Sequence, residues 1–150
     1  GWGWGKRKPY TVTVSAPKIS SIEASSGSDV TGSGLTGDSI NIDVSSGADV
    51  TVRDIQGGTV RLETSSGSDL TASGTCELVR ADASSGSDIN AGKLVCADGR
   101  AEASSGSDIT VHVTGKMTAD VSSGADVNVR GNPTETEIDK SSGGDVNIRG

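Results

Sequence analysis

The sequence predicts an all-β fold, a parallel β-helix of about seven coils, and three observations lead to it. One hexapeptide, SSG-x-Asp followed by an aliphatic residue, occurs seven times, beginning at Ser25, Ser45, Ser65, Ser84, Ser104, Ser122 and Ser141. Successive copies are 20, 20, 19, 20, 18 and 19 residues apart, a period typical of stacked structural units. Hydrophobic residues are 31% of the 150 and phenylalanine is absent, so Val, Ile, Leu and Ala must fill a thin, continuous core.

Each repeat carries the alternation typical of β-strands. Residues 40–44 (INIDV) place a β-branched residue at every second position, and residues 50–53 (VTVR) resume the pattern after the SSGAD turn. Such alternation indicates strands with one buried and one solvated face. Strands this short cannot all find antiparallel partners within twenty residues, but each can pair in parallel with its equivalent one coil later. The repeats therefore predict a single-stranded solenoid with coils of 18–20 residues.

The winding is predicted to be right-handed. Left-handed β-helices favour hexapeptide sub-periods, which these coils lack, and parallel crossover connections are usually right-handed. A β-sandwich or propeller is the competing all-β interpretation. Those folds need longer repeats or hairpin turns such as Asn-Gly, and the sequence contains no Asn-Gly.

The fixed offset from the repeated bend predicts two inward-facing columns of side chains. The first lies three residues before each SSG and consists of Ile22, Ile42, Leu62, Ala81, Ala101, Ala119 and Ile138. The second follows each repeated aspartate and consists of Val30, Val50, Leu70, Ile89, Ile109, Val127 and Val146.

Residues 1–18 differ from the repeats and are predicted to be an N-terminal extension, with the repeat domain spanning residues 19–150. The extension begins GWGWG and continues with three basic residues. Trp2 and Trp4 would share one face of an extended segment. We interpret them as a cap on the open end of the β-helix, with sugar binding as the alternative.

The repeats also align two columns of acidic side chains. The Asp/Glu column lies two residues before each SSG and consists of Glu23, Asp43, Glu63, Asp82, Glu102, Asp120 and Asp139. The aspartate column lies two residues after each glycine of the hexapeptide and consists of Asp29, Asp49, Asp69, Asp88, Asp108, Asp126 and Asp145. Stacked carboxylates repel one another by about 1 kcal/mol per pair in water, so their recurrence implies a use.

Turn chemistry is the favoured use of the aspartate column, because Asp after a bend can accept bonds from backbone N–H groups. The column is also the weak candidate for a metal site, since Ca²⁺ binds several carboxylate and carbonyl oxygens. The pattern differs from the nonapeptide Ca²⁺-binding β-helix, because the aliphatic residue follows the Asp directly. We therefore expect no cofactor, with weak Ca²⁺ association as the alternative.

Catalytic residues are not predicted. The single histidine, His112, lies on a strand between Val111 and Val113 without a partner for a triad or a metal site. The acids are periodic rather than grouped with arginines, which argues against a polysaccharide-active β-helix enzyme. A net charge of −7 disfavours nucleic acid as a partner, and no run of residues is long and apolar enough to predict membrane insertion.

The two cysteines are predicted to be neighbours. Cys76 and Cys96 each lie eight residues before an SSG motif, so they should face each other on adjacent coils about 4.8 Å apart. That spacing lies within the Cα range of a disulfide. A bridge and a pair of reduced core thiols both remain open at this point.

These motifs carry a resemblance to a known family. The SSG-x-Asp repeats, preceded by a basic and aromatic stretch and by YTVTVSAPKI at residues 10–19, resemble the bacterial head GIN domain auto-transporter adhesins, the DUF2807 family. The DUF4097-type adhesins are similar in their Ser-Gly-Asp periodicity and are the second choice. The resemblance covers residues 10–150.

The resemblance implies an exported β-helical protein of the periplasm, outer membrane or cell surface, with no established catalytic activity. Its partner would be a surface ligand, either a glycan or a protein. We therefore expect a non-enzymatic structural or binding module, an adhesin. The alternatives are a Ca²⁺-dependent or glycan-binding module and a polysaccharide-active enzyme.

Overall fold

The structure, a computed structural model, describes residues 9–13, 19–27, 29–34 and 36–149. The described residues form strands and turns and contain no helix. The strands are β1 (Pro9–Thr13), β2 (Ile19–Ala24), β3 (Asp29–Ser33), β4 (Thr36–Val44), β5 (Asp49–Thr64), β6 (Asp69–Ala83), β7 (Asp88–Ala103), β8 (Asp108–Val113), β9 (Lys116–Val121), β10 (Asp126–Arg130), β11 (Glu135–Lys140) and β12 (Asp145–Arg149).

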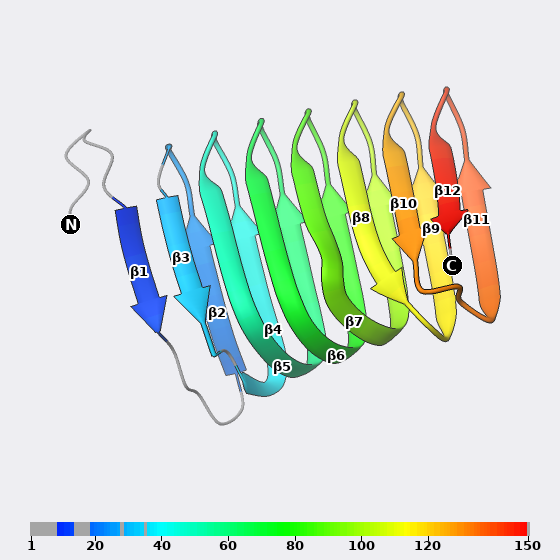
Figure 1. The fold of residues 1–150 in the computed structure, drawn as a ribbon. Helices are drawn as coiled ribbons and strands as arrows, with labels where there is room; N and C mark the ends of the chain where they lie inside the picture. The colour runs from blue at the N-terminus through cyan, green and yellow to red at the C-terminus, as the bar shows by residue number, and fades with distance from the viewer. Residues whose placement is uncertain (1–8, 14–18, 28, 35, 150) are drawn as a thin grey trace.

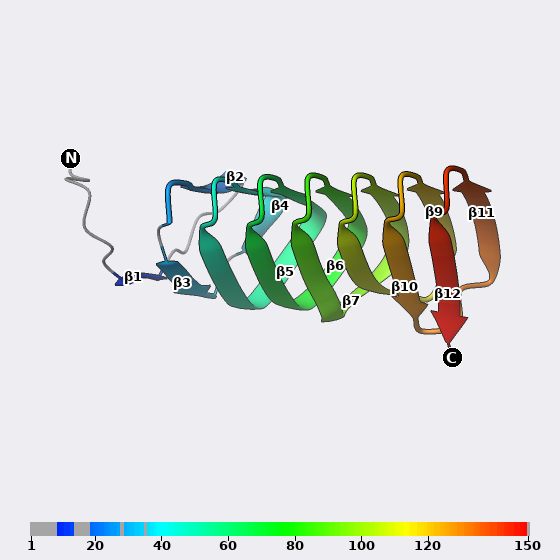
Figure 2. The same ribbon diagram turned by 90° about the horizontal axis from the view of Figure 1, so that it is seen from above.

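The strands form a flattened parallel β-solenoid of about seven turns with two layers (Figures 1 and 2). The front layer has the order β1-β3-β5-β6-β7-β8-β10-β12. The back layer runs β2-β4-β5-β6-β7-β9-β11, and strands β5 to β7 bend around to serve both layers. In Figure 1 the chain descends in front, rises behind and advances from left to right, which is a right-handed winding. The predicted fold class is confirmed.

The SSG motifs form one edge of the solenoid, along the top of Figure 1, which we call the serine edge. In each motif the second serine and the glycine have positive φ, for example 53° at Ser46 and 74° at Gly47. The Ala48 N–H donates to the Ser45 carbonyl at 3.1 Å, as in a type I′ turn. The Gly47 N–H donates to Ser66 in the next coil at 3.1 Å, so the turns are bonded to one another along the edge.

Both predicted inward columns form the core. Each member lies opposite its counterpart on the neighbouring coil, and Leu62, Ile109 and Val127 are fully buried. Ile138, in the last coil, is 41% exposed, because no further coil of the described chain packs against it. Val146 is partly buried for the same reason. The column register is right along the whole solenoid, and only the burial of its last coil differs.

The opposite edge, which we call the bend edge, is less regular. The pairing register shifts between Val52 and Ile55 in β5, between Thr71 and Ser73 in β6, and between Ala91 and Val95 in β7. The extra residues of these β-bulges lie in β5 and β7, at the foot of the front layer. Bulges re-aim side chains and interrupt a ladder, so this is the part of the solenoid where the repeat is broken.

The predicted N-terminal extension lies partly outside the described residues, including Trp2 and Trp4. Its described part, β1, pairs in parallel with β3 and adds one strand to the front layer. The division between residues 1–18 and 19–150 stays a prediction.

Candidate binding faces

The aspartate column lies along the front layer beside the serine edge. Its members are paired in register from Asp29 to Asp145, so each carboxylate from Asp49 to Asp126 has like charges on the coils above and below, and each end member has one on one side. Burial, followed by the charges of Asp69 and Asp29, raises the pKa of Asp49. The pKa values of Asp69 and Asp108 are raised in the same way, first by burial and then by one neighbouring aspartate.

The turn bonds expected of this column are made by other residues. From Asp49 to Asp145, no carboxylate of the column bonds to the backbone of an SSG turn in the described structure. The buried Ser68 hydroxyl accepts from the Ser65 N–H at 3.1 Å and lies 2.7 Å from the Ser65 carbonyl. Ser87 and Ser107 make equivalent contacts with the first serine of their own motifs. The residue before the aspartate, rather than the aspartate, therefore fastens the turn.

The Asp/Glu column lies on the back layer beside a short ladder of arginines. Arg61, Arg80 and Arg100 occupy equivalent positions on neighbouring coils. Arg61 pairs with Glu63 at 2.7 Å and Arg100 with Glu102 at 3.2 Å. These exposed pairs contribute little stability. Each pair joins two residues of the same strand, so it orients the arginine side chain along that strand.

The pKa values of two members of this column are also raised. Burial is the first cause at Asp43 and Asp82, followed at both by the charges of neighbouring acids, and the Arg61 guanidinium opposes the rise. The back layer is therefore a surface of mixed charge with carboxylates in excess.

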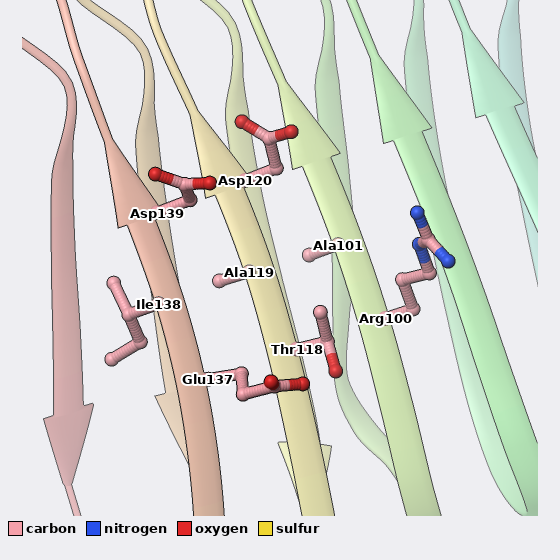
Figure 3. Close-up of a pocket in the computed structure, with 8 residues that line it drawn as sticks. All are labelled: Arg100, Ala101, Thr118, Ala119, Asp120, Glu137, Ile138 and Asp139. Carbon is pink, nitrogen blue, oxygen red and sulfur yellow. The ribbon is translucent and has the colours of Figure 1, made fainter.

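A shallow hollow of about 440 Å³ lies at the C-terminal end of this back layer. Figure 3 shows the carboxylates of Asp120 and Asp139 beside one another on β9 and β11, with Glu137 reaching toward Thr118. Arg100 lies on β7 with its guanidinium apart from these acids. The hollow presents carboxylates on an open surface, with no histidine or nucleophilic cysteine among its lining residues.

A second hollow, of about 370 Å³, lies on the front layer near the bend edge, and we call it the basic hollow. Its lining residues are Thr51, Val52, Arg53, Thr71, Ala72, Ser73, Asn90 and Lys93. They include two cations and no acid. The repeat pattern does not predict this grouping, because Arg53 and Lys93 stand at different distances from their SSG motifs.

The structure places the two cysteines as their spacing predicts and joins them. Cys76 on β6 is the register partner of Cys96 on β7, with 4.5 Å between Cα atoms. A disulfide links them across a sequence separation of 20. Cys96 is buried and Cys76 is partly buried against the core.

His112 lies on β8, opposite Arg130 of β10. Its ring lies close to Gly131, since a side chain at that glycine would come within 2.6 Å of the histidine Cδ2. No acidic residue of the described chain forms an ion pair with it. Within the described ranges, no three His, Cys, Asp or Glu side chains are grouped as metal ligands. No helix of membrane-spanning length and apolarity occurs in this part of the chain.

Comparisons with known proteins show a family through the sequence and a shared fold through the structure. A sequence profile described as "putative auto-transporter adhesin, head GIN domain" matches residues 3–133. The crystal structure of a "putative adhesin" from Parabacteroides distasonis ATCC 8503 has a TM-score of 0.83 at 18% identity, over 93% of this chain and 60% of that one. Another "putative adhesin", from Bacteroides fragilis NCTC 9343, has a TM-score of 0.70 at 19% identity, over 81% of this chain and 56% of that one.

The chain thus spans 60% and 56% of the lengths of those two proteins. At identities this low the likeness concerns the fold. A search of curated proteins returned no match.

Proposed function

Since the chain belongs to the head GIN domain family of auto-transporter adhesins, we propose that it is an exported, non-enzymatic binding module of the bacterial cell surface. It would hold a surface ligand by contact with an outer face of the solenoid. The family and the structurally similar proteins are named as adhesins, which supports a binding role. A glycan is the ligand class that the front layer favours.

The observation that carries this proposal is a ladder of polar side chains on the front layer. Beside the aspartate column, one residue from each coil points outward in register, namely Thr31, Thr51, Thr71, Asn90, Thr110, Asn128 and Asn147. Hydroxyl and amide groups both donate and accept hydrogen bonds. Spaced at about 4.8 Å on a rigid sheet, they form a surface suited to an extended, hydroxyl-rich chain.

A glycan array with the purified protein tests this function. The protein should be retained on a subset of the glycans. Mass spectrometry of the recovered glycan should show its full mass and no shortened product. Release of fragments would show an enzyme instead. Surface labelling of intact cells tests export, and a protein found only in the cytoplasm would contradict the proposed location.

Calcium is expected to play a minor part. The stacked carboxylates of the aspartate column favour cations, yet each coil offers too few oxygen ligands for a closed Ca²⁺ shell. We expect weak association that is screened by salt. Calorimetry that finds micromolar, stoichiometric Ca²⁺ binding would replace this proposal with a Ca²⁺-dependent one.

A further inference from the structure

The basic hollow is where positive charge and the broken repeat coincide. The whole chain carries a net charge of −7, and three other hollows in the described structure are each lined by at least two carboxylates. The basic hollow is lined by Arg53 and Lys93 and by no acid. A cationic site on an acidic rod selects anionic ligands locally, because opposite charges attract most strongly at short range.

The bulges create this grouping. Counting from the SSG motifs would place Gly92 opposite Ser73, since both lie eight residues after the first serine of their motif. The register shift in β6 and β7 instead places Lys93 opposite Ser73. Arg53 lies at the register shift between β5 and β6, where it has no partner in β6. Arg53 and Lys93 both line the hollow, from β5 and β7 on either side of β6.

The two cations are available to a ligand. Both side chains are exposed, and neither is ion-paired with any acid in the described part of the chain. Arg130 of β10 lies outside the lining of the hollow, although its Nη1 is 3.6 Å from the point where a Gly92 side chain would begin.

Neutral donors and acceptors complete the hollow. Thr51, Thr71 and Asn90 are consecutive members of the polar ladder and lie beside the cations. Asn90 Oδ1 accepts from the Gly92 N–H at 3.4 Å, which leaves its amide NH₂ to donate outward. The site therefore combines guanidinium and ammonium groups for a carboxylate with hydroxyl and amide groups for sugar hydroxyls.

We propose that the basic hollow binds a carboxylated oligosaccharide, with the uronic-acid carboxylate held by Arg53 and Lys93 and the ring hydroxyls by Thr51, Thr71 and Asn90. This inference rests on the proposed binding function and names its ligand class and site. The hollow contains no aromatic side chain on which a neutral sugar could stack, so the charge carries the recognition. Charge-assisted binding of this kind weakens as salt is added.

Isothermal titration at low ionic strength with an oligogalacturonate, a neutral galacto-oligosaccharide and a heparin fragment tests the proposal. The wild type should bind the oligogalacturonate, lose affinity as salt is added and show no heat with the neutral sugar. Arg53→Ala/Lys93→Ala should weaken binding by about tenfold or more. The matched control is Arg61→Ala, which removes an arginine from the back layer and should leave the affinity unchanged. All three proteins should have the same melting temperature, because the substituted side chains are exposed.

Oligogalacturonate binding that survives the double substitution would overturn the site. Tighter binding of heparin than of oligogalacturonate would overturn the choice of carboxylate. A wild-type protein that is retained on neutral glycans but does not bind oligogalacturonate would overturn this inference and leave the proposed adhesin function standing. Absence of binding to any glycan or cell surface would instead contradict the proposed function itself.

Discussion

At the serine edge the solenoid repeats one backbone conformation in every coil, whereas at the bend edge successive coils take different paths. The φ values of the second serine lie between 48° and 56° in all seven turns, and the turns bond to one another through backbone groups. At the bend edge, the pairing register shifts in three successive strand pairs, β5 with β6, β6 with β7 and β7 with β8. The serine edge thus fixes the spacing of the coils, whereas the backbone path at the bend edge can differ from one coil to the next.

The two edges also differ in charge. The serine edge is bordered by the aspartate column, whose members repel one another, while the bend edge gathers Arg53 and Lys93 at the basic hollow. Regular stacking forces identical charges into line, because every coil places the same residue at the same position. A bulge removes that constraint and lets one coil place a different side chain. The repeated turn therefore lies at the serine edge, and the ligand site that we propose lies at the bend edge.

The largest expected effect on the free energy of unfolding comes from a charged substitution in the core, which lies between the two edges. Leu70 is 1% exposed and belongs to the second inward column. Leu70→Asp buries an unpaired charge and should lower the free energy of unfolding by more than about 3 kcal/mol. The control, Thr71→Asp, places the same side chain at the next, exposed position and should change the free energy of unfolding by about 0.5 kcal/mol or less. Thermal denaturation measures both, and an unchanged melting temperature for Leu70→Asp would disprove the register.

Alanine substitutions at two glycines of one coil, one at each edge, allow the edges to be compared directly. Gly74, at the bend edge, has φ +136°, and a β-carbon there would overlap the backbone of Ile55. Gly67, at the serine edge, has φ +72° and open space around it. Gly67→Ala should lower the free energy of unfolding by about 1 kcal/mol, from backbone strain alone. Gly74→Ala should lower it clearly more, because its β-carbon also overlaps the Ile55 backbone. Equal melting temperatures for the two variants would contradict this difference in packing.

Reduction of the disulfide should have an intermediate effect. The bridge between Cys76 and Cys96 spans a sequence separation of 20, and closing a loop of this size contributes about 3 kcal/mol in the chain-entropy estimate. The melting temperature should fall after treatment with dithiothreitol. Titration of the denatured, unreduced protein checks the bond itself. No free thiols are expected, and two would show that the cysteines are reduced core residues.

The smallest effect concerns pH and the aspartate column. The pKa values of Asp49, Asp69 and Asp108 are raised in the folded protein, so the folded state binds protons more tightly than the unfolded chain. This stabilisation is fully present below the ordinary carboxyl pKa of 3.8 and is lost as the pH rises through the folded pKa values. The melting temperature should therefore be higher near pH 4 than at pH 7. Asp69→Asn should reduce this difference, and a melting temperature that falls on mild acidification would contradict the account.

The fold could be predicted from the sequence because its information is periodic. Once the SSG motif fixes one position in each coil, every residue at a constant offset falls into register, as the inward columns and the pair Cys76 and Cys96 show. The exposure of Ile138 was not predicted. The distance from the SSG motif assigns a residue to a column, but it does not show whether a further coil covers that residue.

The candidate site could be predicted only in part, for two physical reasons. A bulge shifts the offset by one residue, so Lys93 rather than Gly92 faces Ser73. The fastening of the serine-edge turn was assigned to the repeated aspartate, although the bonds come from the serine before it. That position holds Ser68, Ser87 and Ser107 in three coils. In others it holds Ala48, Ala125 and Gly144, which contribute only their backbone N–H, so no repeated pattern pointed to it.

The separation of the repeated turn from the proposed ligand site is tested most directly by mapping the amide signals of the wild-type protein by NMR while oligogalacturonate is added. The shifted signals should cluster at residues 51–53, 71–73 and 90–93, while the signals of the SSG turns beside Asp49, Asp69 and Asp88 should stay in place. Shifts centred on the serine edge, or spread evenly along the solenoid, would contradict it.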